Sequence, residues 1–271
     1  MRELFTRIRW PLLLLSALVL AALTAPWIAP FDPAFQPDPI ALALQPPSGA
    51  HLFGTDPYSR DVLSRVLFGA RASLGIALLA VAVALTLGAA VGAIAALSGR
   101  WIDAALMRFA DAMLAIPRIL LLLLVVASTG PVRPWTLALV LGVTGWMVTA
   151  RLVRQETRRL LATEYVKGAA ALGVPPGRLW RVHILPGLLP TLAVAASLAF
   201  AAAVPLEAAL SFLGLGVTPP TASWGNIILE TEGRLLRAWW LLLFPMLAIL
   251  LATLSANLIA ERIGDQRGES S

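Results

Sequence analysis

Six apolar runs, each long enough to cross a lipid bilayer, constrain the fold of this chain more than any other feature of its sequence. A bilayer core of roughly 30 Å needs about 20 consecutive apolar residues in a helix, and in hydrocarbon a single apolar run satisfies its own backbone only as a helix. The sequence therefore predicts an all-α, polytopic membrane protein with six transmembrane helices. The expected spans are residues 11–29, 74–97, 112–129, 135–153, 188–210 and 239–259.

Composition excludes one large water-soluble core. Of the 271 residues, 59% are hydrophobic and 13% are charged, and a soluble fold of this size has too little interior to hide so much apolar surface. The net charge of +6 would favour a nucleic-acid partner in a soluble protein. Here the basic residues lie beside the ends of spans, so we expect contact with membrane lipid and no nucleic acid. The chain contains no cysteine, which excludes disulfides, thiol catalysis and thiolate metal sites.

The distribution of Lys and Arg predicts the orientation. With the N-terminus in the cytoplasm, fifteen of the 21 Lys and Arg residues fall on the cytoplasmic side and six outside. This bias follows the positive-inside rule and places both termini in the cytoplasm. The first apolar run is long enough to span and lacks a clean processing site, so we expect it to be retained rather than removed as a signal peptide.

The predicted organisation has four parts. Residues 1–30 form a cytoplasmic N-terminus and the first transmembrane helix, and residues 31–73 form a proline-rich extracytoplasmic loop. Residues 74–260 form a five-helix core, and residues 261–271 form a cytoplasmic tail. Within the core, residues 154–187 form a basic cytoplasmic loop, named the docking loop below.

The docking loop is a polar, helix-forming interruption in an otherwise lipid-soluble chain. Ala169 and Ala170 favour a helix, and Gly173 can supply the positive φ that ends it. The pair Pro175-Pro176 stops helical continuation and can begin the next helix. The sequence therefore predicts a helix–turn–helix that docks a soluble partner, in preference to an ordinary cytoplasmic loop.

Charged residues outside the docking loop leave several interpretations open. Asp56, Arg60, Asp61 and Arg65 alternate in sign along an expected helix, where pairs four residues apart such as Asp61–Arg65 can form. This segment is either a solvated surface helix or part of a surface that meets a binding protein. Glu207 near the outer end of the fifth span either lines a pathway or ties spans together, because an ionisable group there faces the bundle or a cavity.

Three further features concern the interior of the membrane and the histidines. Arg118, one to two turns inside the third span, is expected to snorkel to the cytoplasm and is not assigned to a site. Gly88 and Gly92 are spaced for close approach of a neighbouring helix. His51 and His183 fall on opposite sides of the membrane, so they cannot form a metal-binding pair.

Glu164, Ala169, Gly173 and the run Ile184-Leu185-Pro186 are spaced as in the EAA loop of ABC-importer permeases, which sits in a groove of the ATPase subunit. Residues 52–74, 207–216 and 219–225 resemble further blocks of the dipeptide/oligopeptide/nickel branch of that family. The resemblance covers nearly the whole chain, and the length fits the smaller, C-type, of the two permease subunits in such systems.

This resemblance implies a six-helix, type I ABC-importer permease fold without a catalytic or metal site on this chain. It implies four kinds of partner: a homologous permease subunit, two ABC ATPase subunits, an extracytoplasmic substrate-binding protein and membrane lipid. ATP and Mg would be bound by the ATPases, since the chain lacks the phosphate-loop pattern G-x-x-x-x-G-K-[ST]. The implied location is a bacterial or archaeal plasma (inner) membrane.

The implied substrate is a di- or oligopeptide. The alternatives are import of nickel or another small solute by the same kind of machinery and, from a different class, an ATPase-independent secondary transporter. The candidate residues for ATPase docking are Glu164, Lys167, Ala169, Ala170, Gly173, Arg178, Ile184 and Pro186. The candidates for the pathway or outer mouth are Glu207, Ser211 and Trp224, and those for contact with the binding protein are Asp56, Arg60 and Asp61.

Overall fold

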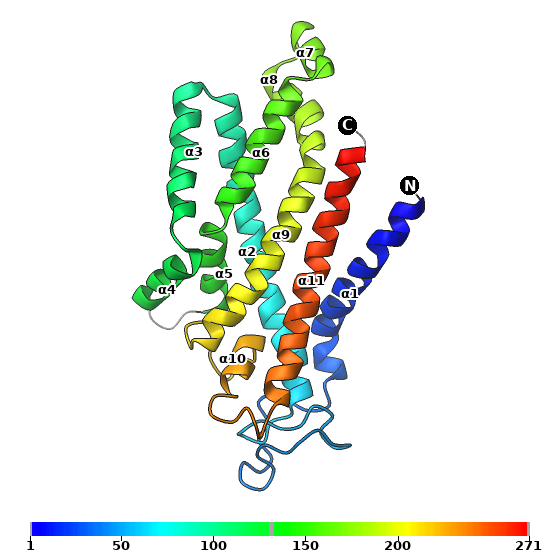
Figure 1. Cartoon of the computed structure of the whole chain (residues 1–271), viewed down its shortest axis with the longest axis vertical. Helices are drawn as coiled ribbons and strands as arrows, with labels where there is room; N and C mark the ends of the chain where they lie inside the picture. The colour runs from blue at the N-terminus through cyan, green and yellow to red at the C-terminus, as the bar shows by residue number, and fades with distance from the viewer. Residues whose placement is uncertain (1, 130–132, 270–271) are drawn as a thin grey trace.

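The computed structural model describes residues 2–129 and 133–269 (Figure 1). Throughout these residues the regular elements are helical, which confirms the all-α class. In chain order they are α1 (Arg2–Ile28), α2 (Val62–Leu97), α3 (Arg100–Ala115), α4 (Arg118–Thr129), α5 (Pro134–Val143), α6 (Trp146–Leu161), α7 (Glu164–Ala171), α8 (Pro176–Leu179), the short π-helix η1 (Trp180–Ile184), α9 (Leu185–Phe212), α10 (Trp224–Leu229) and α11 (Trp240–Glu269).

Four helical segments are long and apolar enough to cross a membrane: the Arg9–Ile28 part of α1, all of α2, the continuous path Pro176–Phe212, and the Trp240–Asp265 part of α11. Two helix pairs pass the same test but are bent, α3 with α4 by 83° and α5 with α6 by 44°. If each bent pair is one crossing, the described chain has the six spans that the sequence predicts.

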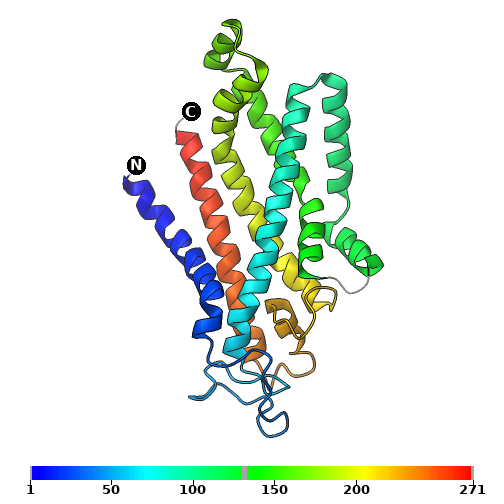
Figure 2. The ribbon, with the colours of Figure 1, turned by 180° about the vertical axis from the view of Figure 1, so that it is seen from behind.

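The two ends of the bundle carry different structures. Both ends of the described chain lie at the same end as α7 and α8 (Figure 1). The segment between α1 and α2 and the short helix α10 lie at the opposite end, as the view from behind also shows (Figure 2). The arrangement separates the docking loop from the proline-rich loop by the full length of the long helices.

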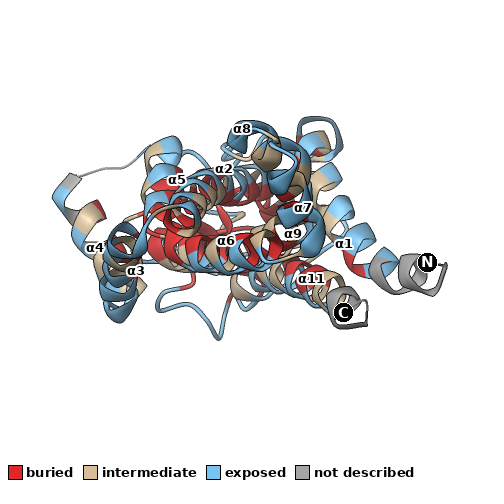
Figure 3. Ribbon diagram, turned by 90° about the horizontal axis from the view of Figure 1, so that it is seen from above, coloured by how far each residue is buried: buried red, intermediate tan, exposed pale blue. Residues whose placement is uncertain are grey.

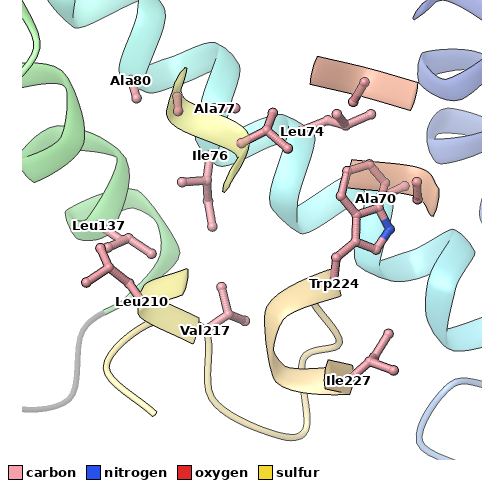
Figure 4. Packing of buried hydrophobic residues seen from close by; sticks show 14 of the residues in the cluster. Ala70, Leu74, Ile76, Ala77, Ala80, Leu137, Leu210, Val217, Trp224 and Ile227 are labelled. Carbon is pink, nitrogen blue, oxygen red and sulfur yellow. The ribbon is translucent and has the colours of Figure 1, made fainter. Parts of the chain in front are cut away.

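The main buried cluster is formed by α2, α5, α9, α10 and α11, with Leu122 and Val126 of α4 packed into it. Helix α6 packs in two smaller buried clusters, and α3 lies at the margin of the bundle (Figure 3). The indole of Trp224 in α10 packs into a buried cluster with Ala70 and Leu74 of α2, Leu210 of α9 and Ile227 of α10 (Figure 4). Because lipid tails are as apolar as these side chains, close packing and interhelical hydrogen bonds hold such a bundle together.

The expected close approach at Gly88 and Gly92 is confirmed, and the neighbouring helix is α6. A Cβ atom at Gly88 would lie 2.5 Å from Cβ of Thr149, and one at Gly92 would lie 2.4 Å from the carbonyl oxygen of Ala150. Side chains at these positions would overlap α6, so the two glycines allow α2 and α6 to touch along their backbones.

The second span begins earlier than residue 74, the expected start. Asp61 caps the helix, its carboxylate accepting a hydrogen bond of 2.8 Å from the backbone N–H of Ser64, and α2 runs unbroken from Val62 to Leu97. The extracytoplasmic loop predicted over residues 31–73 therefore includes the first turns of α2. The apolar run alone missed these turns, because buried polar residues such as Arg65 interrupt it.

The expectation of an unbroken third helix over 112–129 and an unbroken fourth over 135–153 is wrong. Ile116 and Pro117 separate α3 from α4, because proline cannot donate the helical hydrogen bond and disfavours helix in the preceding residue. Thr144 and Gly145 separate α5 from α6. Residues 100–111, expected in a loop, form most of α3.

The last two spans extend beyond their predicted limits. The helical path into α9 starts at Pro176, before the expected residue 188. Helix α11 runs to Glu269, so most of the tail predicted over residues 261–271 continues the last helix. Met1, at the start of the predicted N-terminal part, and residues 270–271, at the end of the tail, lie outside the described residues.

Candidate functional site

The docking loop folds as the helix–turn–helix that its sequence predicts. Helix α7 ends at Ala171, and Gly173 follows in the left-handed region with φ of +79°. That conformation costs little for glycine and more for residues with a side chain. Helix α8 begins with Pro176 at its first position, where the missing N–H removes no helical hydrogen bond.

Most of the candidate docking residues are accessible. Glu164, Lys167, Ala170, Gly173, Arg178 and Pro186 are exposed, and Ala169 is half-buried. Nζ of Lys167 lies 3.0 Å from Oε1 of Glu164, an exposed pair of the kind that contributes little stability. Two apolar side chains that the sequence analysis did not select, Leu172 at 87% exposed and Tyr165 at 53%, lie in the same segment.

Ile184 does not share this exposure, and its assignment to the docking surface is wrong. Its side chain is 1% exposed and packs with Val153 and Leu160 of α6 and Leu188 of α9. The residue is a β-branched hydrophobe at the junction of η1 and α9, where it faces α6. It holds the loop against the bundle instead of meeting a partner.

At the end of the bundle opposite the docking loop, a network of four charges joins the segment between α1 and α2 to the segment that follows α10. Nε of Arg60 lies 2.6 Å from Oδ2 of Asp56, and its Nη2 lies 2.6 Å from Oε1 of Glu230. Arg65 contacts the same two carboxylates. Two guanidinium groups and two carboxylates therefore neutralise one another and connect the segment before α2 to the end of α10. We name these four residues the outer network.

The expected exposed surface at Asp56, Arg60 and Asp61 is not found. Their exposed fractions are 0%, 5% and 3%. The predicted pair Asp61–Arg65 does not form. The carboxylate of Asp61 instead caps α2, and its Oδ1 lies 2.9 Å from Nδ1 of His51. Only Arg65 of this group lies within a helix. A single sequence does not reveal Glu230 as the acid that draws the arginines inward.

The carboxyl of Glu207 is fully buried, and its neighbours are hydroxyl groups. Oγ of Ser211 donates a hydrogen bond of 2.7 Å to Oε1 of Glu207. The hydroxyls of Ser73 and Ser223 lie beside the same carboxyl. Ser211 lies in α9 as Glu207 does, and Oε2 of Glu207 has no hydrogen-bond partner in the described part of the chain, so both the tying role and the pathway role stay predictions.

Trp224 and Ser211 have different surroundings. Trp224 is 0% exposed, and its Nε1 donates a hydrogen bond of 3.1 Å to the carbonyl oxygen of Val66. Its assignment as a wall of the pathway is wrong, because the indole fills the core between α10 and α2. Ser211 borders a hollow of about 730 Å³ at the same end of the bundle, which Arg60 and Glu230 of the outer network also border.

Arg118 does not snorkel to the cytoplasmic end of the bundle. It is the first residue of α4, and its Nη2 donates a hydrogen bond of 2.6 Å to the carbonyl oxygen of Leu141 in α5. Gly145 makes room for this arrangement, since a Cβ atom there would lie 2.7 Å from Nη2. The 83° bend at Pro117 turns the start of α4 toward α5 and carries the side chain with it.

Ion pairs between α3 and α6 were not predicted. Asp103 contacts both Arg154 and Arg158, and Asp111 contacts Arg151. The signal was present in the spacing, since Arg154 and Arg158 are four residues apart and so lie on one helix face. The expectation that residues 100–111 form a loop hid the acidic partner helix.

Comparisons with known proteins agree with this architecture. Residues 88–266 match the family described as binding-protein-dependent transport system inner membrane component. A chain from a structure described as inward facing conformations of the MetNI methionine ABC transporter is similar, with a TM-score of 0.58 and 16% identity, over 74% of this chain and 97% of that chain. At this identity the likeness shows the fold alone, and it confirms the type I importer permease fold.

Relatives of higher identity cover most of the chain. A putative peptide transport system permease protein of Brucella suis biovar 1 is 41% identical over 94% of this chain and 84% of that protein. The di/tripeptide transport system permease protein DppC of Pseudomonas aeruginosa is 38% identical over 94% and 85%, respectively. The dipeptide transport system permease protein DppC of Alkalihalophilus pseudofirmus is 37% identical over 94% and 83%. The chain therefore belongs to the family of inner membrane components of binding-protein-dependent transport systems.

Proposed function

We propose that this permease imports di- and oligopeptides and forms half of the translocation pathway, with a homologous permease subunit as the other half. The names of three relatives at 37–41% identity, each covered over more than four fifths of its length, support the substrate class. The observation that carries the proposal is the exposed helix–turn–helix of α7 and α8, which stands at one end of a bundle with six candidate spans.

ATP is hydrolysed on separate ATPase subunits, and in this proposal two of them bind ATP and Mg beneath the two permeases. One ATPase receives the docking loop of this chain in a groove. The exposed Leu172 and Tyr165 supply apolar contact, while Glu164, Lys167 and Arg178 supply charge at the rim. Gly173 presents bare backbone in open space, so a partner surface can approach it closely.

The proposed orientation puts the docking loop and both termini in the cytoplasm of a bacterium or archaeon. The bias of fifteen Lys and Arg residues against six supports this choice. The outer network and the loops that it joins then face the extracytoplasmic side. A substrate-binding protein would approach them there.

Exposed side chains of those loops are better candidates for the binding-protein contact than the buried charges. Ile40 is 94% exposed, Leu236 is 97% exposed and Tyr58 is 51% exposed. Large apolar side chains that are open to solvent favour a protein partner. In this proposal Asp56, Arg60 and Asp61 act beneath the contact surface, where they fix the shape of the loops.

Coupling between ATP and transport requires the docking loop to bind the ATPase differently in two states of the permease. A ligand shifts a conformational equilibrium only by the difference between its affinities for the two states. ATP binding would move the ATPases, the docking loop would follow, and the bundle would open outward to accept a peptide.

Gly173→Trp tests the docking role, and Gly49→Trp is its control. A Cβ atom meets nothing within 4 Å at either position, and Gly49 belongs to the segment between α1 and α2, which lies at the opposite end of the bundle. We expect Gly173→Trp to abolish recovery of the ATPase in a mild-detergent pull-down while membrane insertion is kept. Gly49→Trp should recover the ATPase normally. Normal recovery with Gly173→Trp would refute the docking assignment.

The reconstituted complex tests transport itself. Proteoliposomes that contain this chain and the proteins that purify with it should take up a labelled dipeptide only when ATP and the binding protein are present. Uptake driven by an ion gradient without ATP would instead assign the chain to secondary transport.

A further inference from the structure

Arg118 stands at the 83° bend between α3 and α4 with an unbalanced charge. Its Nη2 donates to the carbonyl oxygen of Leu141, while its Nε is buried and has no hydrogen-bond partner in the described part of the chain. Within residues 2–129 and 133–269, no carboxylate lies within ion-pair distance of this guanidinium, although the buried arginines Arg60 and Arg65 are paired. Arg118 is therefore a half-buried arginine whose charge is not balanced by a carboxylate of the described residues.

Two hollows meet at this side chain. The first, of about 110 Å³, lies between α2, α5, α6 and α9, and it is lined by small or apolar residues such as Ala84, Thr149, Ala199 and Ala202. The second, of about 170 Å³, lies along the bend itself. Arg118 is the one charged residue in the lining of each hollow.

The second hollow reaches the surface of the chain. Among its lining residues, Leu114 and Ile116 are 38% and 44% exposed, and Val148 is 51% exposed. An arginine that faced lipid at this depth would be costly, and such groups face the bundle interior or a water-filled cavity. The position of Arg118 therefore favours a hollow that holds water and solute.

The chemistry of the guanidinium selects the ligand. It carries five N–H donors and no acceptor, and one neutral carbonyl satisfies only one of these donors. A carboxylate fits the remaining donors with charge-assisted and often paired hydrogen bonds. We propose that Arg118 binds a carboxylate of the transported solute at the bend and makes the pathway selective for anionic groups. The proposal rests on the proposed function, since the C-terminal carboxylate of a peptide is such a group.

Two other roles would leave the same geometry. Arg118 could only tie α4 to Leu141, or it could pair with a carboxylate of the neighbouring permease. A tie to the neutral carbonyl of Leu141 keeps the guanidinium charge, so the hollow would still attract dissolved anions, whereas a carboxylate of the neighbouring permease would cancel that charge. Neither role distinguishes between two solutes that differ in one charge. The ratio of thiol rates therefore tests the pairing with the neighbouring permease, and the uptake comparison tests the tie.

The absence of cysteine from this chain allows the potential in the hollow to be measured directly. Ala202 lines the first hollow and is exposed. The substitution Ala202→Cys therefore places the sole thiol of the chain in this hollow. In the assembled complex, its rates of reaction with an anionic and a cationic methanethiosulfonate reagent are compared. We expect the anionic reagent to be favoured, and Arg118→Gln to lower the ratio of rates by about tenfold, since the two reagents differ by two unit charges close to a guanidinium in a wet site.

Two variants serve as controls for the ratio. Arg118→Lys keeps the charge and should keep the preference. Arg108→Gln removes an equal charge from an exposed position on α3, away from both hollows, and should change nothing. A ratio that Arg118→Gln leaves unchanged, or a thiol that reacts with neither reagent, would overturn the proposal.

Uptake tests recognition of the solute. The complex is supplied with alanyl-alanine or with its C-terminal amide. For each peptide, the uptake rate of the variant complex is divided by the uptake rate of the unsubstituted complex. Both complexes use the same binding protein, so its preference between the two peptides cancels in this ratio. Arg118→Gln should lower uptake of the free acid about tenfold more than uptake of the amide. An equal loss of both would overturn the proposal and favour a structural tie. If the unsubstituted complex imports neither peptide, the proposed function fails, while the ratio of thiol rates still reports on Arg118.

Discussion

Arg60 and Glu230 are 170 residues apart in the sequence, yet Nη2 of Arg60 donates a hydrogen bond of 2.6 Å to Oε1 of Glu230. This contact fastens the segment before α2 to the end of α10, and Arg65 strengthens it from within α2. The end of the permease opposite the docking loop is therefore held together by buried charge as well as by the apolar cluster around Trp224.

Glu230→Ala should destabilise the folded permease. Arg60 and Arg65 would keep only Asp56, and removing one partner from a buried ion pair costs about 3–5 kcal/mol. The midpoint of thermal unfolding in detergent should fall clearly. Glu232→Ala is the matched control, because Glu232 is exposed and two residues away, and its midpoint should stay close to that of the unsubstituted protein. Equal midpoints for both variants would refute the stabilising role of the outer network.

Gly92→Ala should disturb the contact between α2 and α6. The new methyl group would lie 2.4 Å from the carbonyl oxygen of Ala150, a backbone atom that cannot move without α6. Overpacking of this kind costs about 1–3 kcal/mol. Gly75→Ala in the same helix meets nothing within 4 Å and should be neutral or slightly stabilising. Thermal unfolding of the two variants side by side checks the prediction, and a lower midpoint for Gly75→Ala would contradict it.

Ile184→Ala should loosen the docking loop. The side chain is 1% exposed against Val153, Leu160 and Leu188, and truncating a buried isoleucine costs about 2–5 kcal/mol. Limited proteolysis should cut the loop faster in this variant. Val182→Ala changes a residue of η1 that is 57% exposed, and it should leave the rate of cleavage unchanged. Equal cleavage in both variants would mean that Ile184 does not anchor the loop.

Glu207→Leu should act on stability more than on selectivity. The change removes the acceptor of the Ser211 hydroxyl, and leaving such a buried group unpaired costs about 1–3 kcal/mol. Glu207→Gln keeps an acceptor oxygen and should unfold close to the unsubstituted midpoint. Unfolding and peptide uptake are measured together. If the Glu207→Leu variant unfolds at the normal midpoint but no longer transports peptide, the result would favour a role of Glu207 in the translocation pathway.

Local signals in the sequence predicted the apolar spans and the turn of the docking loop. Residues that are close along the chain decide these features, as Gly173 and Pro176 do when they end one helix and begin the next. Pro117 was an equally local signal. If a helix is assumed from Arg100 onward, this proline predicts that the helix ends just before it, which is where α3 ends.

The remaining features depend on partners that are distant in sequence. Asp56 is buried because it meets Arg60 and Arg65, and both arginines also reach Glu230, more than 160 residues away. Sign alternation along residues 56–65 therefore predicted an exposed helix, either solvated or in contact with a binding protein, where the fold has a buried network. Exposure of a charged residue cannot be predicted from one sequence when its counter-charge comes from another loop.

Helix α6 gives the bend and the docking loop a mechanical connection. It contains neither proline nor glycine, and its 16 residues form a rod of about 24 Å. The rod begins beside Gly145, where the guanidinium of Arg118 lies, and it ends three residues before Glu164 of α7. Ala162 and Thr163 form a turn between α6 and α7, and beyond that turn a push on α7 would reach the elbow at Gly145 along one unbroken helix. If the docking loop receives the ATPase as we propose, a movement of the ATPase and a change in the shape of the space around Arg118 would occur together.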